Sequence, residues 1–320
     1  FGIEPEYYVP ILPTLLVNGS KGVGTGYSCD VPNFSVIDII NNLRAKLNGG
    51  EFSEIHPEYE KFRGTITRDS KNKYHSHGLY RVIDTNKLEI TELPLKVWTQ
   101  SYKNFLEKQI EANKIAGYED HSSEEHIKFI IKTKGGGSTT HSSLLHKMSS
   151  EQIEKLFKLS SAINMTNMYL FDADGKIKRY RDVVHILEDF YKVRLEFYHK
   201  RRTHILNKFK YSLKFLKNKI RFIQEIMDDK LVIYRLAHSK VVDLLDSRGY
   251  DKMAPEWKSE SKRSYEYLMN IRMTAFTKER IDELAKRYTS IETEYNKLKN
   301  TTPEQMWLSD LGTFEEDFYE

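Results

Sequence analysis

The chain has 320 residues, of which 39% are hydrophobic and 12% aromatic, and it carries a net charge of +4. This length predicts two or three domains, and the modest apolar content favours long, half-exposed helices. The single cysteine, Cys29, excludes an intrachain disulfide framework and fits a reducing compartment. No apolar run reaches membrane-spanning length and no signal peptide opens the chain, and its first residue, Phe1, is interpreted as the start of a piece of a longer polypeptide.

Residues 1–34 are rich in proline and glycine. Four prolines among the first 32 residues exclude a continuous helix, so we expect extended chain broken by turns. Three alternate glycines, Gly22, Gly24 and Gly26, indicate positive φ angles or a close approach of the backbone to a partner. Their G-x-G-x-G spacing, with Pro32 close behind, does not fit a dinucleotide fingerprint or a P-loop.

Two interpretations of this glycine stretch remain, a tight structural turn and an apolar wedge. In the second, Val23 protrudes and unstacks a base step of DNA, while the neighbouring Ser20, Lys21 and Thr25 lie against phosphates. The stretch alone does not decide between the two.

Residues 35–175 predict a small mixed α/β domain. Ser35 fits the N-cap of a helix over 36–47, which Gly49 and Gly50 stop. Ser149 and Gln152 form a capping box for a helix over 151–159. The remaining elements are strands over 62–69, 79–85, 87–94 and 126–133, a helix over 98–110, a flexible loop over 134–143 and a hairpin over 168–180 that turns at Asp174-Gly175.

Two heptad seams mark the second half of the chain. Apolar residues recur at spacings of three and four, which is typical of supercoiled helices. We expect an antiparallel coiled-coil arm with a helical knob at its tip; the alternative is two ordinary amphipathic helices in one bundle. The seams are Leu206, Phe209, Leu213, Leu216, Ile220, Ile223 and Met227, and Ile281, Leu284, Tyr288, Ile291, Tyr295 and Leu298.

The charge is unevenly placed. Residues 176–230 hold 16 Lys and Arg against 7 Asp and Glu, whereas both flanking parts are slightly acidic. This basic stretch indicates either a surface that faces a polyanion or a solvated helix face.

No complete active site is found. Asp172 and Asp174 lack the further oxygen ligands of a calcium loop, so a hairpin turn is preferred. The histidines at 75 and 77, 121 and 126, and 141 and 146 have no third ligand nearby, which favours surface histidines over a zinc site. Cys29 has no catalytic partner set around it.

Six blocks of sequence carry a family resemblance in order along the chain. They are EPEYYVPILPTLLVNGSKGVGTGYSCDVPNF, ITELPLKVWTQSYK, LFDADGKIKRY, EDFYKVRLEFYHKR, LLDSRGYD and MWLSDLGTFEEDF. Together they resemble the eukaryotic-type, type IIA DNA topoisomerases over nearly the whole chain. The resemblance implies the later part of the breakage–reunion region, with a tower domain and a coiled coil that carries the dimer interface called the C-gate.

The resemblance sets the expected organisation and chemistry. The fold class is α+β, and the enzyme family cuts one duplex with paired tyrosines, passes a second duplex through the break and reseals it. The nucleophilic tyrosine, the Mg²⁺ module and the ATPase lie upstream of this chain, so we expect no catalytic residue, metal or cofactor here, and Mg²⁺ and ATP in the full enzyme. The expected divisions are a DNA-contacting segment over 1–34, the tower over 35–175, a first coiled-coil helix over 176–230, the C-gate knob over 231–276, the returning helix over 277–300 and a C-terminal helix over 301–320.

The resemblance also implies which residues meet DNA. The family carries an aliphatic residue, usually Ile, that inserts between base pairs at the position of Val23. Valine lacks one methylene, worth about 0.8 kcal/mol of burial, so weaker wedging is expected. The stretch 158–167 matches DNA-contacting residues, the stretch 94–103 is a second candidate in which Trp98 is interpreted as core, and the basic stretch would line the path of the transported duplex. The expected contacts are Asn18, Ser20, Lys21, Thr25, Lys96, Lys103, Lys158, Ser160, Ser161, Asn164, Thr166 and Asn167.

The expected partners are double-stranded DNA and a second copy of the chain through the C-gate, with no membrane. A nuclear location is expected, with viral, cytoplasmic or organellar sites as alternatives. Two other classes remain, a non-catalytic DNA-binding coiled-coil scaffold and a nucleotide-binding enzyme. A scaffold gives no reason for the glycine stretch and mixed domain, and the sequence offers no nucleotide pocket.

Overall fold

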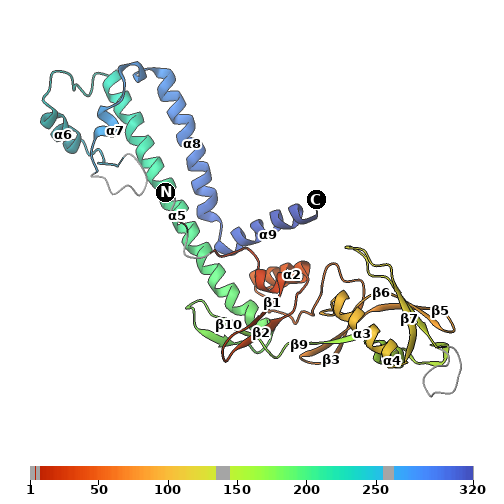
Figure 1. Cartoon of the computed structure of the whole chain (residues 1–320). Helices are drawn as coiled ribbons and strands as arrows, with labels where there is room; N and C mark the ends of the chain where they lie inside the picture. The colour runs from red at the N-terminus through yellow and green to blue at the C-terminus, as the bar shows by residue number, and fades with distance from the viewer. Residues whose placement is uncertain (1–3, 5–7, 135–144, 255–262, 320) are drawn as a thin grey trace. The chain divides into compact units, whose positions relative to one another are not determined.

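The computed structural model describes residues 4, 8–134, 145–254 and 263–319 (Figure 1). The chain divides into two compact units, Phe1–Val193 and Arg194–Glu320. Several antiparallel sheets and long helices make it an α+β protein, as the sequence predicted. None of the described helices is both long and apolar enough to span a bilayer.

The first unit opens with a short helix and a hairpin. Helix α1 (Thr14–Asn18) begins directly after Pro13, whose carbonyl accepts from the Leu16 amide, so the prolines do not exclude a single helical turn here. Strands β1 (Ser20–Val23) and β2 (Ser28–Val31) pair antiparallel. Helix α2 (Val36–Leu47) starts at the predicted cap, where Ser35 Oγ accepts from the Asp38 amide.

Two further antiparallel sheets follow in the same unit. The strands predicted from β-branched and aromatic runs are all present, but three polar or glycine-broken strands, β4, β7 and β9, were not predicted. One sheet has the order β3-β4-β9, with β3 Thr65–Ser70, β4 Lys73–His77 and β9 Ser160–Asn164. The other has the order β5-β6-β8-β7, with β5 Leu79–Asp84, β6 Lys87–Glu92, β7 Ile115–Asp120 and β8 Phe129–Thr133.

One hydrophobic core joins the four-stranded sheet to two helices, α3 (Thr99–Glu111) and α4 (Ser150–Phe157). Tyr102 of α3 is fully buried, and its hydroxyl donates to the Phe157 carbonyl at 2.8 Å. The capping box of Ser149 and Gln152 is present at the start of α4, as predicted. A 3-10 turn, Leu145–Lys147, precedes it, and the predicted loop over 134–143 lies almost wholly outside the described residues.

The predicted hairpin over 168–180 is confirmed. Strands β10 (Tyr169–Phe171) and β11 (Ile177–Arg179) pair antiparallel, and Gly175 has φ 76° in the turn. Asp172 Oδ1 accepts from the backbone amides of Asp174 and Lys176, so this carboxylate stabilises the turn.

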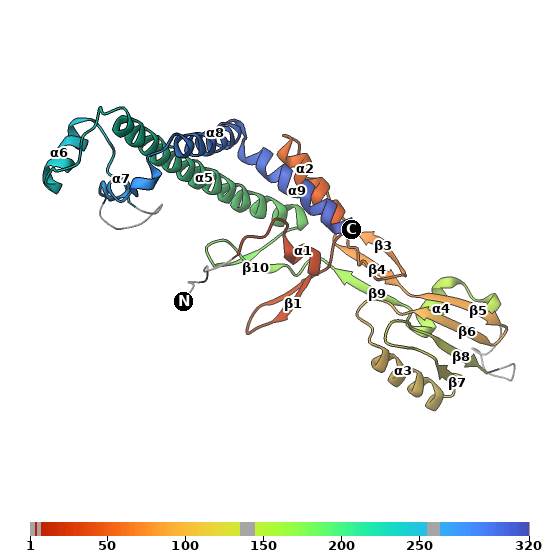
Figure 2. The same ribbon diagram turned by 90° about the horizontal axis from the view of Figure 1, so that it is seen from above.

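The second unit holds the two helices of the predicted seams. Both views show α8 (Lys278–Asn300) returning beside the long helix α5 (Val183–Met227), part of which belongs to this unit (Figures 1 and 2). Leu216 and Ile223 of α5 are buried against Leu284 of α8, so the predicted apolar positions do meet.

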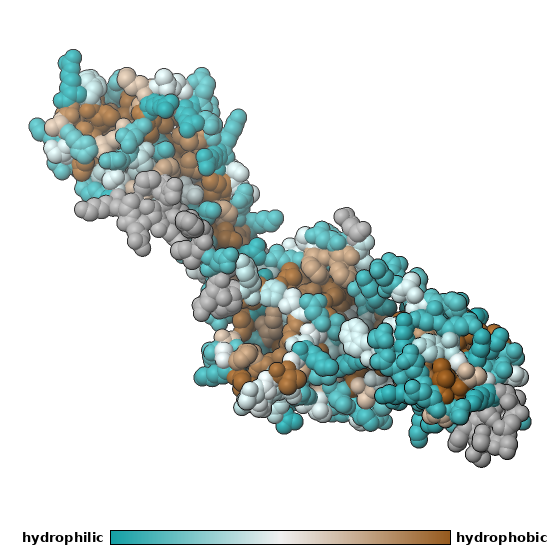
Figure 3. All heavy atoms as spheres, viewed as in Figure 1, coloured by the Kyte–Doolittle hydropathy of each residue, from teal (hydrophilic) through white to brown (hydrophobic). Residues whose placement is uncertain are grey.

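A small helical cluster lies where α5 turns back toward α8. It contains α6 (His238–Ser247), α7 (Glu266–Met269) and a 3-10 turn, Met273–Ala275, around a separate core that includes Phe222 and Leu245. Apolar side chains also reach the surface in this part of the unit (Figure 3). The most exposed are Met273, at 89%, and Tyr234, at 70%.

Helix α9 (Pro303–Tyr319) packs back onto α5 within the second unit. Trp307 is fully buried and stacks on Tyr198 with ring centroids 5.5 Å apart. Asp310 Oδ2 accepts from Tyr198 Oη and from Arg201 Nη1, each at 2.7 Å. A tertiary contact therefore uses part of the basic stretch.

Other cations of the basic stretch are also engaged within their own units. Arg202 donates to the Thr301 and Lys299 carbonyls at the C-terminus of α8, both at 2.8 Å. Further ion pairs are Lys178–Asp189, Lys200–Glu196, Lys214–Asp251, Arg221–Glu225 and Lys230–Asp228. These pairs reduce the cationic charge that α5 can offer to a polyanion.

Candidate nucleic-acid interface

The β1–β2 hairpin presents Val23 at its tip. Val23 ends β1, opposite Ser28, and its side chain is 87% exposed. The turn closes through a hydrogen bond from the Gly24 amide to the Tyr27 carbonyl at 2.8 Å. Exposure of a valine between glycines is unfavourable in water, and it fits a side chain that is buried only in a complex.

The three alternate glycines differ in what they require. Gly26 has φ 86°, a conformation that favours glycine. At Gly22 an added Cβ would meet nothing within 4 Å, and at Gly24 it would meet only the Tyr27 carbonyl oxygen at 3.7 Å. No crowding within the described chain therefore explains Gly22 or Gly24, whereas a partner lying against this backbone would.

The strictest glycine of the segment, Gly19, was not predicted from the sequence. It has φ 67°, and a Cβ there would lie 2.5 Å from Asn33 Oδ1 and 2.9 Å from the Val31 carbonyl oxygen. This glycine lets α1 turn directly into β1. The expected contacts around the hairpin are accessible to different degrees: Asn18, Lys21 and Thr25 are exposed, and Ser20 is half-buried.

The stretch 158–167 forms the end of α4, the strand β9 and the chain that follows. Lys158 is exposed, has φ 51° and lies with its ammonium 4.7 Å from the centre of the Phe105 ring. Asn164 and Thr166 are exposed, while Ser160 and Ser161 are half-buried in the sheet with β4.

Asn167 connects this stretch to the glycine hairpin. Its carbonyl accepts from the Asp30 amide at 2.8 Å, and its Nδ2 donates to Ser28 Oγ at 2.7 Å. Two segments that were predicted separately as DNA contacts therefore lie together, although they are far apart in sequence.

The stretch 94–103 divides into two parts. Lys96 Nζ lies 2.8 and 2.7 Å from the two carboxylate oxygens of Asp30, so this lysine belongs to the hairpin group. Lys103 instead pairs with Asp120 of β7 at 2.5 Å, and this hydrogen bond raises the pKa of Lys103. The interpretation of Trp98 as core is wrong, because its side chain is 77% exposed beside the turn at the start of α3.

The histidines take structural roles where they are described. His77 Nδ1 lies 2.8 Å from Glu154 Oε2, its Nε2 lies 2.8 Å from Thr67 Oγ1, and His121 lies 3.3 Å from Glu119. Among the described residues, no group of three or more His, Cys, Asp or Glu side chains could hold a metal ion. Position 141 falls outside the described residues.

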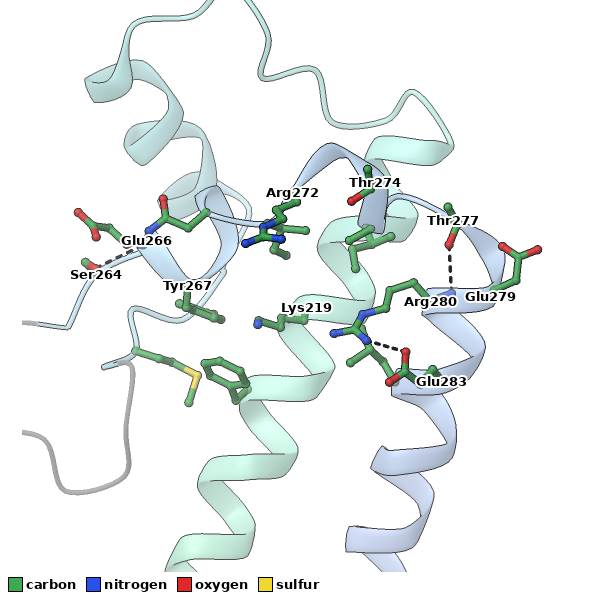
Figure 4. Close-up of a pocket in the computed structure, with 17 residues that line it drawn as sticks. Lys219, Ser264, Glu266, Tyr267, Arg272, Thr274, Thr277, Glu279, Arg280 and Glu283 are labelled. Atoms are coloured by element: carbon green, nitrogen blue, oxygen red, sulfur yellow. Dashed lines mark hydrogen bonds and ion pairs between the residues drawn. The ribbon is translucent and has the colours of Figure 1, made fainter.

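A hollow of about 1020 Å³ opens in the second unit beside α5, α7 and α8 (Figure 4). Lys219 of α5 and Arg280 of α8 reach into it, and Arg280 pairs with Glu283 at 2.5 Å. Burial lowers the pKa of Lys219, and the nearby charges of Arg280 and Arg287 lower it further. The lining residues include no histidine, cysteine or aspartate, so the hollow lacks the paired groups of a common acid–base or metal site.

Comparison with known proteins gives consistent matches over nearly the whole chain. The sequence profile of the family described as the A-type subunit of DNA gyrase/topoisomerase IV matches residues 2–312. DNA topoisomerase 2 of Plasmodium falciparum is 35% identical over 98% of this chain and 24% of its own length. DNA topoisomerase 2-alpha of Homo sapiens is 32% identical over 98% of this chain and 22% of its own length.

A solved structure agrees with these matches. The crystal structure of the Plasmodium falciparum topoisomerase II DNA-binding, cleavage and re-ligation domain superposes with a TM-score of 0.80 and 34% identity, covering 99% of this chain and 45% of that chain. The chain thus spans about a quarter of the length of the curated relatives and less than half of the solved domain.

Proposed function

Since the chain belongs to the type IIA DNA topoisomerases, matching the breakage–reunion region of topoisomerase II, we propose that it binds and bends the duplex that the enzyme cleaves. The resemblance carried by the sequence blocks is thereby confirmed at the family level. The observation that carries the proposal is Val23, an apolar side chain held exposed at the tip of a hairpin whose neighbouring glycines leave the backbone open.

The proposed mechanism is insertion with backbone support. Val23 enters a base step and unstacks it, which bends the duplex, while Lys21, Thr25 and Asn18 contact sugar–phosphate without reading sequence. Ser20 and the exposed or half-buried residues of 158–167 extend the same contact along the bent arm. Binding of this kind is sequence-independent and weakens as salt rises.

The proposed domain roles follow the family. Residues 35–175 form the tower, 176–230 and 277–300 the coiled-coil arm, and 231–276 the knob through which two copies dimerise at the exit gate; 301–320 complete the arm's base. The exposed Met273 and Tyr234 of the knob support a protein contact there.

Catalysis by the whole enzyme is proposed to depend on parts outside this chain. Strand cleavage would use a nucleophilic tyrosine and Mg²⁺, and strand passage would use ATP, each held by other regions of the full protein. No residue of this chain is proposed to ligate either cofactor. The relatives are eukaryotic topoisomerases, which supports a nuclear location.

A non-catalytic DNA-binding scaffold is the second candidate, favoured by the long helices α5 and α8. The two candidates differ in whether DNA is bent at Val23 or only held. The test is Val23→Ala in the intact protein, with Val232→Ala, a half-exposed valine of the second unit, as the matched control.

The bend is measured by fluorescence transfer between the ends of a short duplex at saturating protein. Val23→Ala removes two methyl-sized groups, worth about 1.6 kcal/mol, so we expect the bent fraction to fall roughly tenfold relative to the unbent one. The control should leave the transfer unchanged. An unaltered bend in Val23→Ala would favour the scaffold.

A further inference from the structure

We infer that Asp30, Lys96 and Asn167 form an anchor that fixes the direction of the Val23 hairpin, and that Lys96 and Asn167 act as positioning residues rather than as phosphate contacts. This inference rests on the proposed wedge. It changes the role expected for Lys96 and Asn167 and gives a role to Asp30, which had none.

The hairpin needs an anchor because it has little structure of its own. It consists of two four-residue strands joined by a turn, and its β1 strand is almost wholly exposed. A two-stranded ribbon is at best marginally stable alone in water. A wedge side chain that works against base stacking requires a rigid support, since otherwise the hairpin bends instead of the DNA.

Strand β2 supplies the attachment points. The Asp30 amide donates to the Asn167 carbonyl, and the Asn167 amide group donates to Ser28 Oγ. Between these two bonds, Cys29 forms an isolated bridge with Met168. Beyond them, the rings of Tyr27 and Tyr169 lie 5.7 Å apart. Neighbouring residues on one side of the hairpin thus contact one other segment.

The ion pair provides a second attachment from a different element. Lys96 Nζ reaches both oxygens of Asp30, and the two side chains are only 32% and 31% exposed. Lys96 also has φ 66°, an unfavourable conformation for lysine that surrounding structure must hold in place. This backbone turn is consistent with a side chain committed to the hairpin.

Charge supports the same assignment. Asp30 lies directly opposite Lys21 on a hairpin proposed to face phosphates, where an unpaired carboxylate would repel DNA. Pairing with Lys96 neutralises this carboxylate, so Lys21 remains as the cation for DNA. A lysine that binds both carboxylate oxygens has little freedom to contact a phosphate as well.

The experiment uses four variants of the intact protein: Asp30→Asn, Lys96→Met, the charge-swapped double variant Asp30→Lys/Lys96→Asp, and Lys21→Met as the matched lysine control. Three readouts are taken, namely amide hydrogen exchange of residues 20–31 without DNA, end-to-end fluorescence transfer at saturating protein, and the salt dependence of DNA affinity.

For an anchor, both single variants should speed hairpin exchange at least about fivefold and lower the bent fraction several-fold, with the salt slope unchanged. The charge-swapped variant should restore both to within about twofold. Lys21→Met should instead leave exchange unchanged and reduce the salt slope by roughly one. The inference is overturned if Lys96→Met reduces the salt slope with exchange unchanged, or if Asp30→Asn only tightens DNA binding.

The exchange measurement separates this inference from the proposed function. If Val23→Ala leaves the bend unchanged but Asp30→Asn loosens the hairpin, the wedge is wrong and the anchor stands. If Val23→Ala abolishes bending while both anchor variants behave as the original protein, the wedge stands and the anchor is wrong.

Discussion

Lys158 combines an unusual backbone conformation with an exposed charge. It ends α4 with φ 51°, where glycine is preferred, and its ammonium lies over the Phe105 ring. Lys158→Gly and Lys158→Gln both remove the charge and the ring contact, but only glycine relieves the backbone. We expect the glycine variant to have a free energy of unfolding about 1 kcal/mol above that of the glutamine variant, measured by urea denaturation.

The same two variants test the proposed DNA contact of Lys158. Both should lower DNA affinity equally for all sequences and reduce the salt slope by roughly one, because a single phosphate contact is lost. Lys155→Gln, an exposed lysine on the same helix, serves as the control and should change the slope less. A loss confined to particular sequences would contradict a phosphate contact.

Single residues show where sequence reasoning succeeds and where it stops. The prominence of Val23 was predicted, because glycines on both sides of an apolar residue are a local pattern. The partnership of Asp30 and Lys96 was not, because 66 positions separate them and neither stands out locally. Trp98 was assigned to the core on its residue type alone, and only the fold shows that its position faces outward.

At the scale of elements, Glu225 links α5 to the helical cluster of the second unit. It pairs with Arg221 at 2.7 Å and with Arg248 at 2.9 Å, and Arg248 also donates to the Lys230 carbonyl. Burial acts to raise the pKa of Glu225, but the hydrogen bonds from Arg221, Tyr250 and Arg248 outweigh it and hold this pKa below its usual value.

The lowered pKa of Glu225 predicts a pH-dependent stability. A carboxyl group whose folded-state pKa is depressed stabilises the fold above its unfolded pKa, and this stabilisation is lost as pH falls through the folded pKa. Glu225→Gln should therefore lower the free energy of unfolding by about 1 kcal/mol at pH 7, a value reduced for solvent screening of the partly exposed partners.

The difference between Glu225→Gln and the original chain should shrink as pH falls below about 4.5, near the ordinary pKa of a glutamate. It is measured by chemical denaturation of the 320-residue chain at several pH values. Glu294→Gln, an exposed position on α8, should show no difference at any pH. A difference for Glu225 that stays constant down to about pH 3, well below that ordinary pKa, would rule out the ion pairs as its cause.

The elements themselves were predictable to the extent that their signals are local. Helix α2, α4 and the β10–β11 turn follow from caps and a glycine, and the strands with β-branched runs follow from composition. Strands β4 and β9 were missed because serine, histidine and asparagine become strand residues only when neighbouring strands supply hydrogen bonds. The basic stretch was read as free charge, whereas tertiary ion pairs engage many of its cations.

At the scale of the whole molecule, the proposed exit gate requires two copies to meet through the knob. Met273 is 89% exposed in a 3-10 turn, close to the helical cluster that the family uses for dimerisation. A carboxylate introduced into an apolar contact must lose its hydration without gaining a partner, which costs far more than the lost methionine contacts. Met273→Asp should therefore raise the dimer dissociation constant of the chain at least about tenfold, measured by sedimentation equilibrium.

Trp98→Asp provides the matched control, since Trp98 is a comparably exposed apolar residue in the first unit, outside the knob. It should leave the dissociation constant unchanged. Equal weakening by both variants would indicate a dimer held by dispersed hydrophobic contacts rather than by the knob. A chain that stays monomeric at all concentrations, with or without Met273, would remove the exit gate from the proposal while leaving the DNA wedge intact, because Val23 and its anchor all lie in the first unit.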